Sequence, residues 1–87
     1  MEKLLQMLDA LIEHIETRSP KAESVEWYLL NNLRQFKEIS DSSPSRHEFE
    51  NGLRVLSRFC VDSMDWDDSL FKAATAITEQ ARRDIPS

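Results

Sequence analysis

Residues 45–64 read SRHEFENGLRVLSRFCVDSM, and this stretch decides the fold. Its apolar side chains recur every three or four residues, the period of an amphipathic helix, at Phe49, Leu53, Leu56, Cys60 and Met64. Gly52, Val55 and Phe59 widen the apolar arc to about half of the circumference, as in a helix that lies between two others. Glycine inside a helix costs about 1 kcal/mol relative to alanine, so we expect a neighbouring helix to approach closely at Gly52.

The start of this helix has two candidate caps. Ser45 and Glu48 have the spacing of a capping box, in which the two side chains reciprocally accept hydrogen bonds from free backbone N–H groups. A rival start uses Ser43 as the cap and Pro44 as the first helical residue. Either start predicts a helix that ends near residue 63.

Three more segments have a helical period, near residues 2–17, 20–39 and 66–83. Together with the helix at 45–63 they predict an all-α fold, a compact antiparallel four-helix bundle that forms a single domain over residues 1–87. The chain has one glycine and three prolines. An all-β or α/β fold would need more turn residues than these.

Local signals predict where the second and fourth helices begin. Ser19 is expected to cap the second helix, with Pro20 at the first helical position, where the missing N–H costs nothing. The apolar arc of that helix is then formed by Ala22, Val25, Leu29, Leu33 and Phe36. For the fourth helix we expect Asp65 or Asp67 as the N-cap.

The charge balance restricts the partners. The chain contains 16 acidic and 11 basic residues, a formal net charge of −5. A surface for nucleic acid would show the opposite excess, whereas an acidic protein favours basic partners. No apolar run approaches the ~18 to 20 residues of a membrane span, and the first run is amphipathic, unlike a signal peptide. We therefore expect a cytoplasmic protein without nucleic acid or membrane partners.

No group of residues has the pattern of an active site or a metal site. Cys60 has no second cysteine to pair with, and its place on the apolar arc predicts a buried, inert thiol. His14 and His47 fall on different helices, and neither is three or four residues from another plausible ligand. The aspartates near the fourth helix fail as a calcium loop, because Leu70 stands where glycine is required. We expect no enzyme activity, no cofactor and no metal.

An acidic cluster precedes the fourth helix and consists of Asp62, Asp65, Asp67 and Asp68, with Trp66 among them. In a structural interpretation, these aspartates cap the helix and stabilise the positive end of its dipole. In a functional interpretation, the acids that exceed the needs of one cap form a binding patch together with the tryptophan. Both interpretations stay open from the sequence alone.

Trp27 falls on the polar face of the second predicted helix, opposite Leu29 and Phe36. We expect this side chain to be substantially exposed in the monomer. Because tryptophan is enriched in binding hot spots, it is a candidate second anchor for a partner. In the alternative, the ring folds over a neighbour and is half-buried.

Part of the chain resembles a known group of proteins. Residues 49–70, with Glu50, Gly52, Leu53, Leu56 and Cys60 followed by Asp65, Trp66 and Asp67, are similar to a helix of small acidic all-α immunity proteins of bacterial contact-dependent toxins, the Maf-type group. Arg54 and Arg58 stand where that pattern is more acidic or neutral. The resemblance implies a bacterial protein that binds and blocks a toxin and has no catalytic residues.

These observations favour a non-enzymatic protein-binding domain, most concretely an acidic inhibitor or immunity protein that covers a basic surface on a toxin. The residues expected to bind the partner are Asp62, Asp65, Trp66, Asp67, Asp68 and Trp27. The alternative is a homodimeric adaptor, or a structural module like a secretion chaperone, built on the wide apolar faces of the first and third helices. The sequence is compatible with a monomer and with a homodimer.

Overall fold

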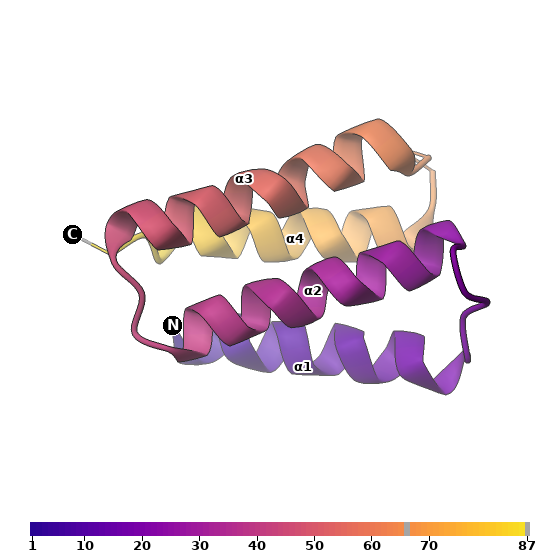
Figure 1. Ribbon diagram of the computed structural model, residues 1–87, viewed down its shortest axis with the longest axis horizontal. Coiled ribbons are helices and arrows are strands. Elements are labelled where there is room, and N and C mark those ends of the chain that lie inside the picture. Colours follow the sequence, from indigo (N-terminus) through magenta and orange to yellow (C-terminus); the bar gives the residue numbers. More distant parts are fainter. Residues whose placement is uncertain (66, 87) are drawn as a thin grey trace.

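The computed structural model describes residues 1–65 and 67–86, and over those residues it contains helices and no strand. In chain order the helices are α1 (Glu2–Thr17), α2 (Val25–Asp41), α3 (Arg46–Ser63) and α4 (Ser69–Arg83) (Figure 1). The predicted all-α class and four-helix bundle are therefore confirmed. The bounds of α1 and α3 agree closely with the predicted ranges, whereas α2 and α4 begin later than predicted.

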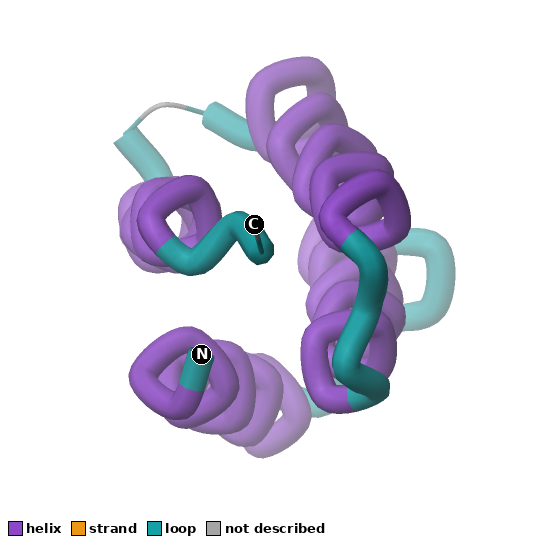
Figure 2. Tube along the Cα trace, turned by 90° about the vertical axis from the view of Figure 1, so that its left-hand side faces the viewer, coloured by secondary structure: helices purple, strands orange, loops and turns teal. Residues whose placement is uncertain are grey.

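The four helices form a bundle in which each helix packs against two others. α1 and α3 each contact α2 and α4, and the described residues of the diagonal pairs make no close backbone contact. Figure 2 looks along the bundle and shows α1 and α4 on one side, with α2 and α3 on the other. Successive helices run antiparallel (Figure 1), so the α1–α2 and α3–α4 connections lie at the same end.

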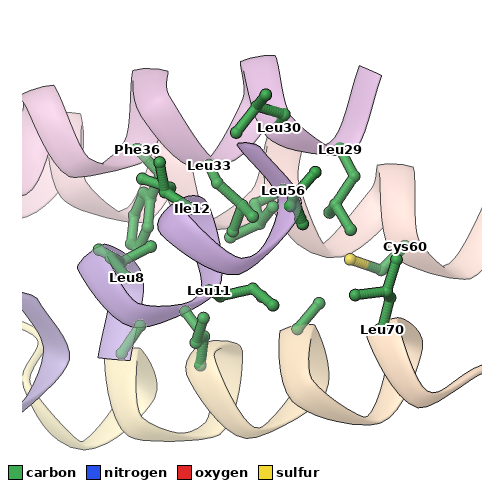
Figure 3. Packing of buried hydrophobic residues seen from close by; sticks show 14 of the residues in the cluster. Leu8, Leu11, Ile12, Leu29, Leu30, Leu33, Phe36, Leu56, Cys60 and Leu70 are labelled. Atoms are coloured by element: carbon green, nitrogen blue, oxygen red, sulfur yellow. The ribbon is translucent and has the colours of Figure 1, made fainter. Parts of the chain in front are cut away.

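The core is one continuous cluster of apolar side chains from all four helices, which meet between them in Figure 3. Its largest fully buried side chains are Phe36, Phe49, Leu4, Leu8, Ile15, Leu29, Leu33, Leu56 and Ile77. The rings of Phe36 and Phe49 are 5.3 Å apart between centroids and join α2 to α3. Each buried side chain of this kind contributes about 1.5 to 3 kcal/mol, much of which the ordering of the chain offsets.

Gly52 lies where α2 and α3 approach closely, as its place in the sequence predicted. A Cβ atom at this position would lie 3.0 Å from Cδ1 of Ile39 and 3.2 Å from Cδ1 of Phe36. Both distances are shorter than ordinary carbon–carbon contacts. The prediction of a close neighbour at Gly52 is confirmed, and that neighbour is α2.

The start of α3 is the predicted capping box. The backbone N–H of Glu48 donates to Oγ of Ser45 over 3.2 Å, and the backbone N–H of Ser45 donates to Oε1 of Glu48 over 3.5 Å. The rival start at Ser43 is wrong. That residue has a φ of 54°, in the left-handed region, whereas an N-cap residue has an extended backbone.

The predicted start of α2 at Ser19 and Pro20 is also wrong. Ser19 has a φ of 49° and donates its N–H to the carbonyl of Glu16, so it belongs to the end of α1. Glu23 has a φ of 68°, which interrupts any helix that begins at Pro20. Ser24 is the N-cap instead, and its Oγ accepts a hydrogen bond from the backbone N–H of Trp27 over 3.2 Å.

The later start changes the apolar arc of α2. Ala22 lies outside α2 and is exposed. Val25 is the first residue of α2, and its side chain is 45% exposed. Both were predicted to face the core. The remaining members of that arc, Leu29, Leu33 and Phe36, are buried as predicted, so the helical phase is correct.

Substituting the two candidate caps of α2 tests where this helix begins. We expect Ser24→Ala to lower the free energy of unfolding by about 1 kcal/mol, because it removes a cap that accepts a backbone hydrogen bond. Ser19→Ala should change it by less than about 0.5 kcal/mol. Urea unfolding of both variants makes the comparison, and a larger loss in Ser19→Ala would contradict the observed start.

Two buried hydroxyl groups differ in whether they are hydrogen-bonded. Ser40 on α2 and Thr78 on α4 are each 4% exposed. Thr78 donates its hydroxyl to the carbonyl of Thr75 over 2.9 Å, whereas Oγ of Ser40 has no hydrogen-bond partner among the residues that the structure describes. A buried polar group without a partner costs free energy.

This difference predicts opposite effects of removing the two hydroxyls. Ser40→Ala should raise the free energy of unfolding by up to about 1 kcal/mol, because it removes a desolvated group and adds helix propensity. Thr78→Val keeps the shape of the side chain and should lower it by about 1 kcal/mol. Thermal unfolding of both variants measures this, and a destabilised Ser40→Ala protein would show that the hydroxyl is bonded in solution.

Candidate protein-binding site

The acidic cluster lies at the end of the bundle where α3 connects to α4 (Figure 1). Asp62 is in the last turn of α3, and Asp65, Asp67 and Asp68 follow in the connection. All four side chains are exposed. Trp66, predicted to act with them, lies outside the described residues.

Of the aspartates, Asp68 caps α4. Its Oδ1 accepts a hydrogen bond from the backbone N–H of Leu70 over 2.8 Å, and its own N–H donates to the carbonyl of Asp65 over 3.0 Å. The predicted caps, Asp65 and Asp67, are wrong. Met64 and Leu70 are both buried, so the chain first turns between these two core anchors and becomes helical only at Ser69.

The side chains of the other three aspartates form no ion pair. Among the described residues, no Lys, Arg or His side chain lies within ion-pair distance of Asp62, Asp65 or Asp67. Acids elsewhere in the bundle differ, since pairs join Arg18 to Glu26 over 2.7 Å and Arg46 to Glu50 over 2.6 Å. Three carboxylates that neither cap nor pair therefore concentrate negative potential at this end of the molecule.

A second acidic region lies in a groove of about 670 Å³ between α1 and α2. It contains five carboxylates and two cations and is lined by Asp9, Ile12, Glu13, Glu16, Arg34, Lys37, Glu38 and Asp41. Ion pairs join Asp9 to Lys37 and Glu16 to Arg34 across the helices. The hydrogen bond from Lys37 to Asp9 raises the pKa of the ammonium group. Exposed pairs of this kind contribute little to stability, but they partly neutralise the acids of the groove.

The sequence did not reveal this second region. Asp9, Glu13 and Glu16 follow the helical spacing of three and four residues on one flank of α1. That spacing was a usable signal for an acidic flank. The packing alone shows that α2 faces this flank and that cations of α2 pair with two of the acids.

Trp27 is half-buried, so the prediction of a substantially exposed ring is wrong. Its ring meets the ring of Tyr28 edge-on, with centroids 5.0 Å apart and planes at 80°. Tyr28 is the more open of the two and is 43% exposed. The structure thus shows the alternative in which the indole folds over a neighbour. No hydrogen bond joins Trp27 to the four aspartates among the described residues.

The described residues offer little for chemistry. Among them, no group of three or more His, Cys, Asp and Glu side chains is placed to hold a metal ion. Cys60 is buried, as predicted, and burial raises the pKa of its thiol to about 11. His14 and His47 are both exposed and lie on different helices. None of the helices in this part of the chain is long and apolar enough to cross a membrane.

Comparisons of the chain with protein-family models, with curated proteins and with solved structures found no match. The similarity to Maf-type immunity proteins thus rests on residues 49–70 alone. The functional proposal therefore rests on the geometry of the acidic cluster.

The two roles of the aspartates can be separated by stability measurements. Asp68→Ala should lower the free energy of unfolding by about 1 kcal/mol, because the cap of α4 is lost. Asp65→Ala should change it by less than about 0.5 kcal/mol, as exposed positions without partners usually do. Equal losses in chemical unfolding of the two variants would mean that Asp65 also supports the fold.

Proposed function

We propose that the protein is a non-enzymatic protein-binding domain, most concretely an acidic inhibitor or immunity protein that covers a basic surface on a toxin. One observation carries this proposal. Asp62, Asp65 and Asp67 are exposed, lie within six residues of one another and have no ion-pair partner among the described residues. Their mutual repulsion is relieved when a positively charged surface approaches.

The position of the cluster supports binding of a protein surface. It lies at the end of the bundle that also carries the α1–α2 connection (Figure 1), and its aspartates are exposed there. Exposed acids of this kind steer a basic partner during diffusion, so they act mainly on the association rate. A tryptophan buried at the interface acts mainly on dissociation. We assign that second role to Trp66, with Trp27 as a further contact.

The test begins with affinity capture of partners from the source cell and then measures binding kinetics. The variant Asp62→Asn/Asp65→Asn/Asp67→Asn retains Asp68 and hence the cap of α4. We expect it to associate about tenfold more slowly at low salt, with a weaker dependence on salt concentration. Trp66→Ala should instead dissociate faster.

A matched control makes the same change in net charge elsewhere. Glu13, Glu38 and Glu79 are exposed and belong to none of the ion pairs of the described residues. Their triple replacement by Gln should leave the association rate within about twofold of the wild type, since it removes the same charge from other faces. If both triple variants associate equally slowly, the effect comes from the net charge alone, and the cluster is not the binding site.

A further inference from the structure

A second surface of the bundle has the composition of an interface. Between α2 and α3 lies a groove of about 340 Å³. Its lining residues are Asn32, Gln35, Phe36, Ile39, Glu48, Asn51, Gly52, Val55 and Leu56. Gly52 is one of these lining residues, and Val55 beside it is 56% exposed. A large exposed aliphatic side chain next to a depression suits contact with a second protein surface.

The outward faces of both helices continue this surface along the bundle. Positions three, four and seven residues apart share a helix face. By this rule Tyr28 joins Asn32 and Gln35 on α2, and Phe59 joins Gly52 and Val55 on α3. None of these side chains is charged, although 31% of the residues of the chain are. Loss of charge at the centre of a surface patch is typical of interface cores.

The other three seams of the described bundle do not suit a contact between two copies. The α1–α2 groove holds five carboxylates and two cations. Arg54 and Arg82 both line the α3–α4 groove. The α1–α4 groove is apolar, but its outward faces carry Lys3, Lys72 and Arg83 together with Glu13 and Glu79, all at helical spacing from Ala10 and Ala76. Each of these faces would have to desolvate several charged side chains on contact.

The outer face of α3 is complementary to itself. Glu48 and Arg58 are exposed, lie five residues on either side of Leu53, and belong to none of the ion pairs of the described residues. When two copies of α3 meet antiparallel about a two-fold axis at that level, Glu48 of each copy faces Arg58 of the other. The same symmetry brings Val55 of each copy opposite Asn51 of the other.

We propose that the α2–α3 face binds the same face of a second copy of this chain, with the two α3 helices antiparallel. Val55 of each copy packs against Asn51, which lines the groove of the other copy, and two symmetric Glu48–Arg58 pairs flank this contact. The antiparallel arrangement also places the acidic connections of the two copies at opposite ends of the dimer, which limits repulsion between two chains of net charge −5. This contact needs no other protein and does not rest on the proposed function.

Sedimentation velocity over a concentration series tests the proposal, and the chain provides a matched control. Val55 and Val61 lie on the same helix and are 56% and 60% exposed, but only Val55 lines the α2–α3 groove. We expect a wild-type dimer, at least about tenfold weaker self-association in Val55→Lys, and no change in Val61→Lys. Circular dichroism verifies that both variants retain the wild-type helix content.

A charge exchange tests the antiparallel arrangement. Arg58→Glu should weaken the dimer, because each symmetric pair becomes two like charges. The double variant Glu48→Arg/Arg58→Glu should restore it, since both pairs re-form with the signs exchanged. The bond from the backbone N–H of residue 48 to Ser45 Oγ remains, whereas the bond from the Ser45 N–H to the Glu48 carboxylate is lost. A folded double variant that stays dissociated overturns the antiparallel pairing.

Three results overturn the proposed interface itself. One is a wild-type protein that sediments as a monomer up to about 1 mM. Another is a dimer that survives Val55→Lys. The last is a dimer that Val61→Lys weakens as much as Val55→Lys does. The acidic-cluster experiment measures binding of a captured partner instead, so either proposal can fail without the other.

Discussion

At Gly52 the missing Cβ atom lets the ends of the Ile39 and Phe36 side chains of α2 lie against the backbone of α3. This close approach allows Phe36 to reach Phe49, one turn earlier on α3. These two rings are the largest fully buried side chains among the described residues, so the contact joins two helices at the widest part of the core. A side chain at position 52 would hold the helices apart and leave space beside both rings, which a closely packed interior does not tolerate.

The charges of the bundle are separated by face, although the chain as a whole is acidic. Acids between α1 and α2 are held by cations from the opposite helix. Asp62, Asp65 and Asp67, at the α3–α4 connection, have no such ion pair among the described residues. The outward α1–α4 face carries Lys3, Lys72 and Arg83 beside Glu13 and Glu79, and the lining of the α2–α3 groove contains one charged residue, Glu48. A partner therefore meets a different potential at each side of the molecule, and the net charge alone describes none of them.

The sequence predicted the fold correctly where the local helix signals agreed with the tertiary packing. The period of three and four residues identified the core faces of α1 and α3, and the spacing of Ser45 and Glu48 identified a cap. The Ser19-Pro20 signal failed because left-handed residues at positions 19 and 23 end one helix and delay the next. The predicted N-cap of α4 was wrong because Met64 and Leu70 are both buried, and this tertiary requirement is not visible in the local sequence.

The candidate site shows the same division. An excess of aspartates over what one helix cap needs was visible in the sequence, and Asp68 is the residue that the cap uses. The burial of Trp27 depends on an edge-on contact with its own neighbour, Tyr28, which a helical wheel does not represent. The acidic groove between α1 and α2 and the α2–α3 groove depend on which flanks meet. A periodic pattern determines where a face lies on its helix but not which helix lies opposite.

The burial of Cys60 makes this residue an internal reporter of how often the bundle opens. Figure 3 shows its sulfur atom in the core, beside Leu70. It is the only cysteine in the chain, its side chain is 3% exposed, and burial raises its pKa to about 11. A thiol reagent attacks the thiolate, so labelling has to wait until helices separate and admit solvent. The labelling rate at fixed pH therefore counts excursions from the native state, without any substitution or attached dye that would disturb the packing.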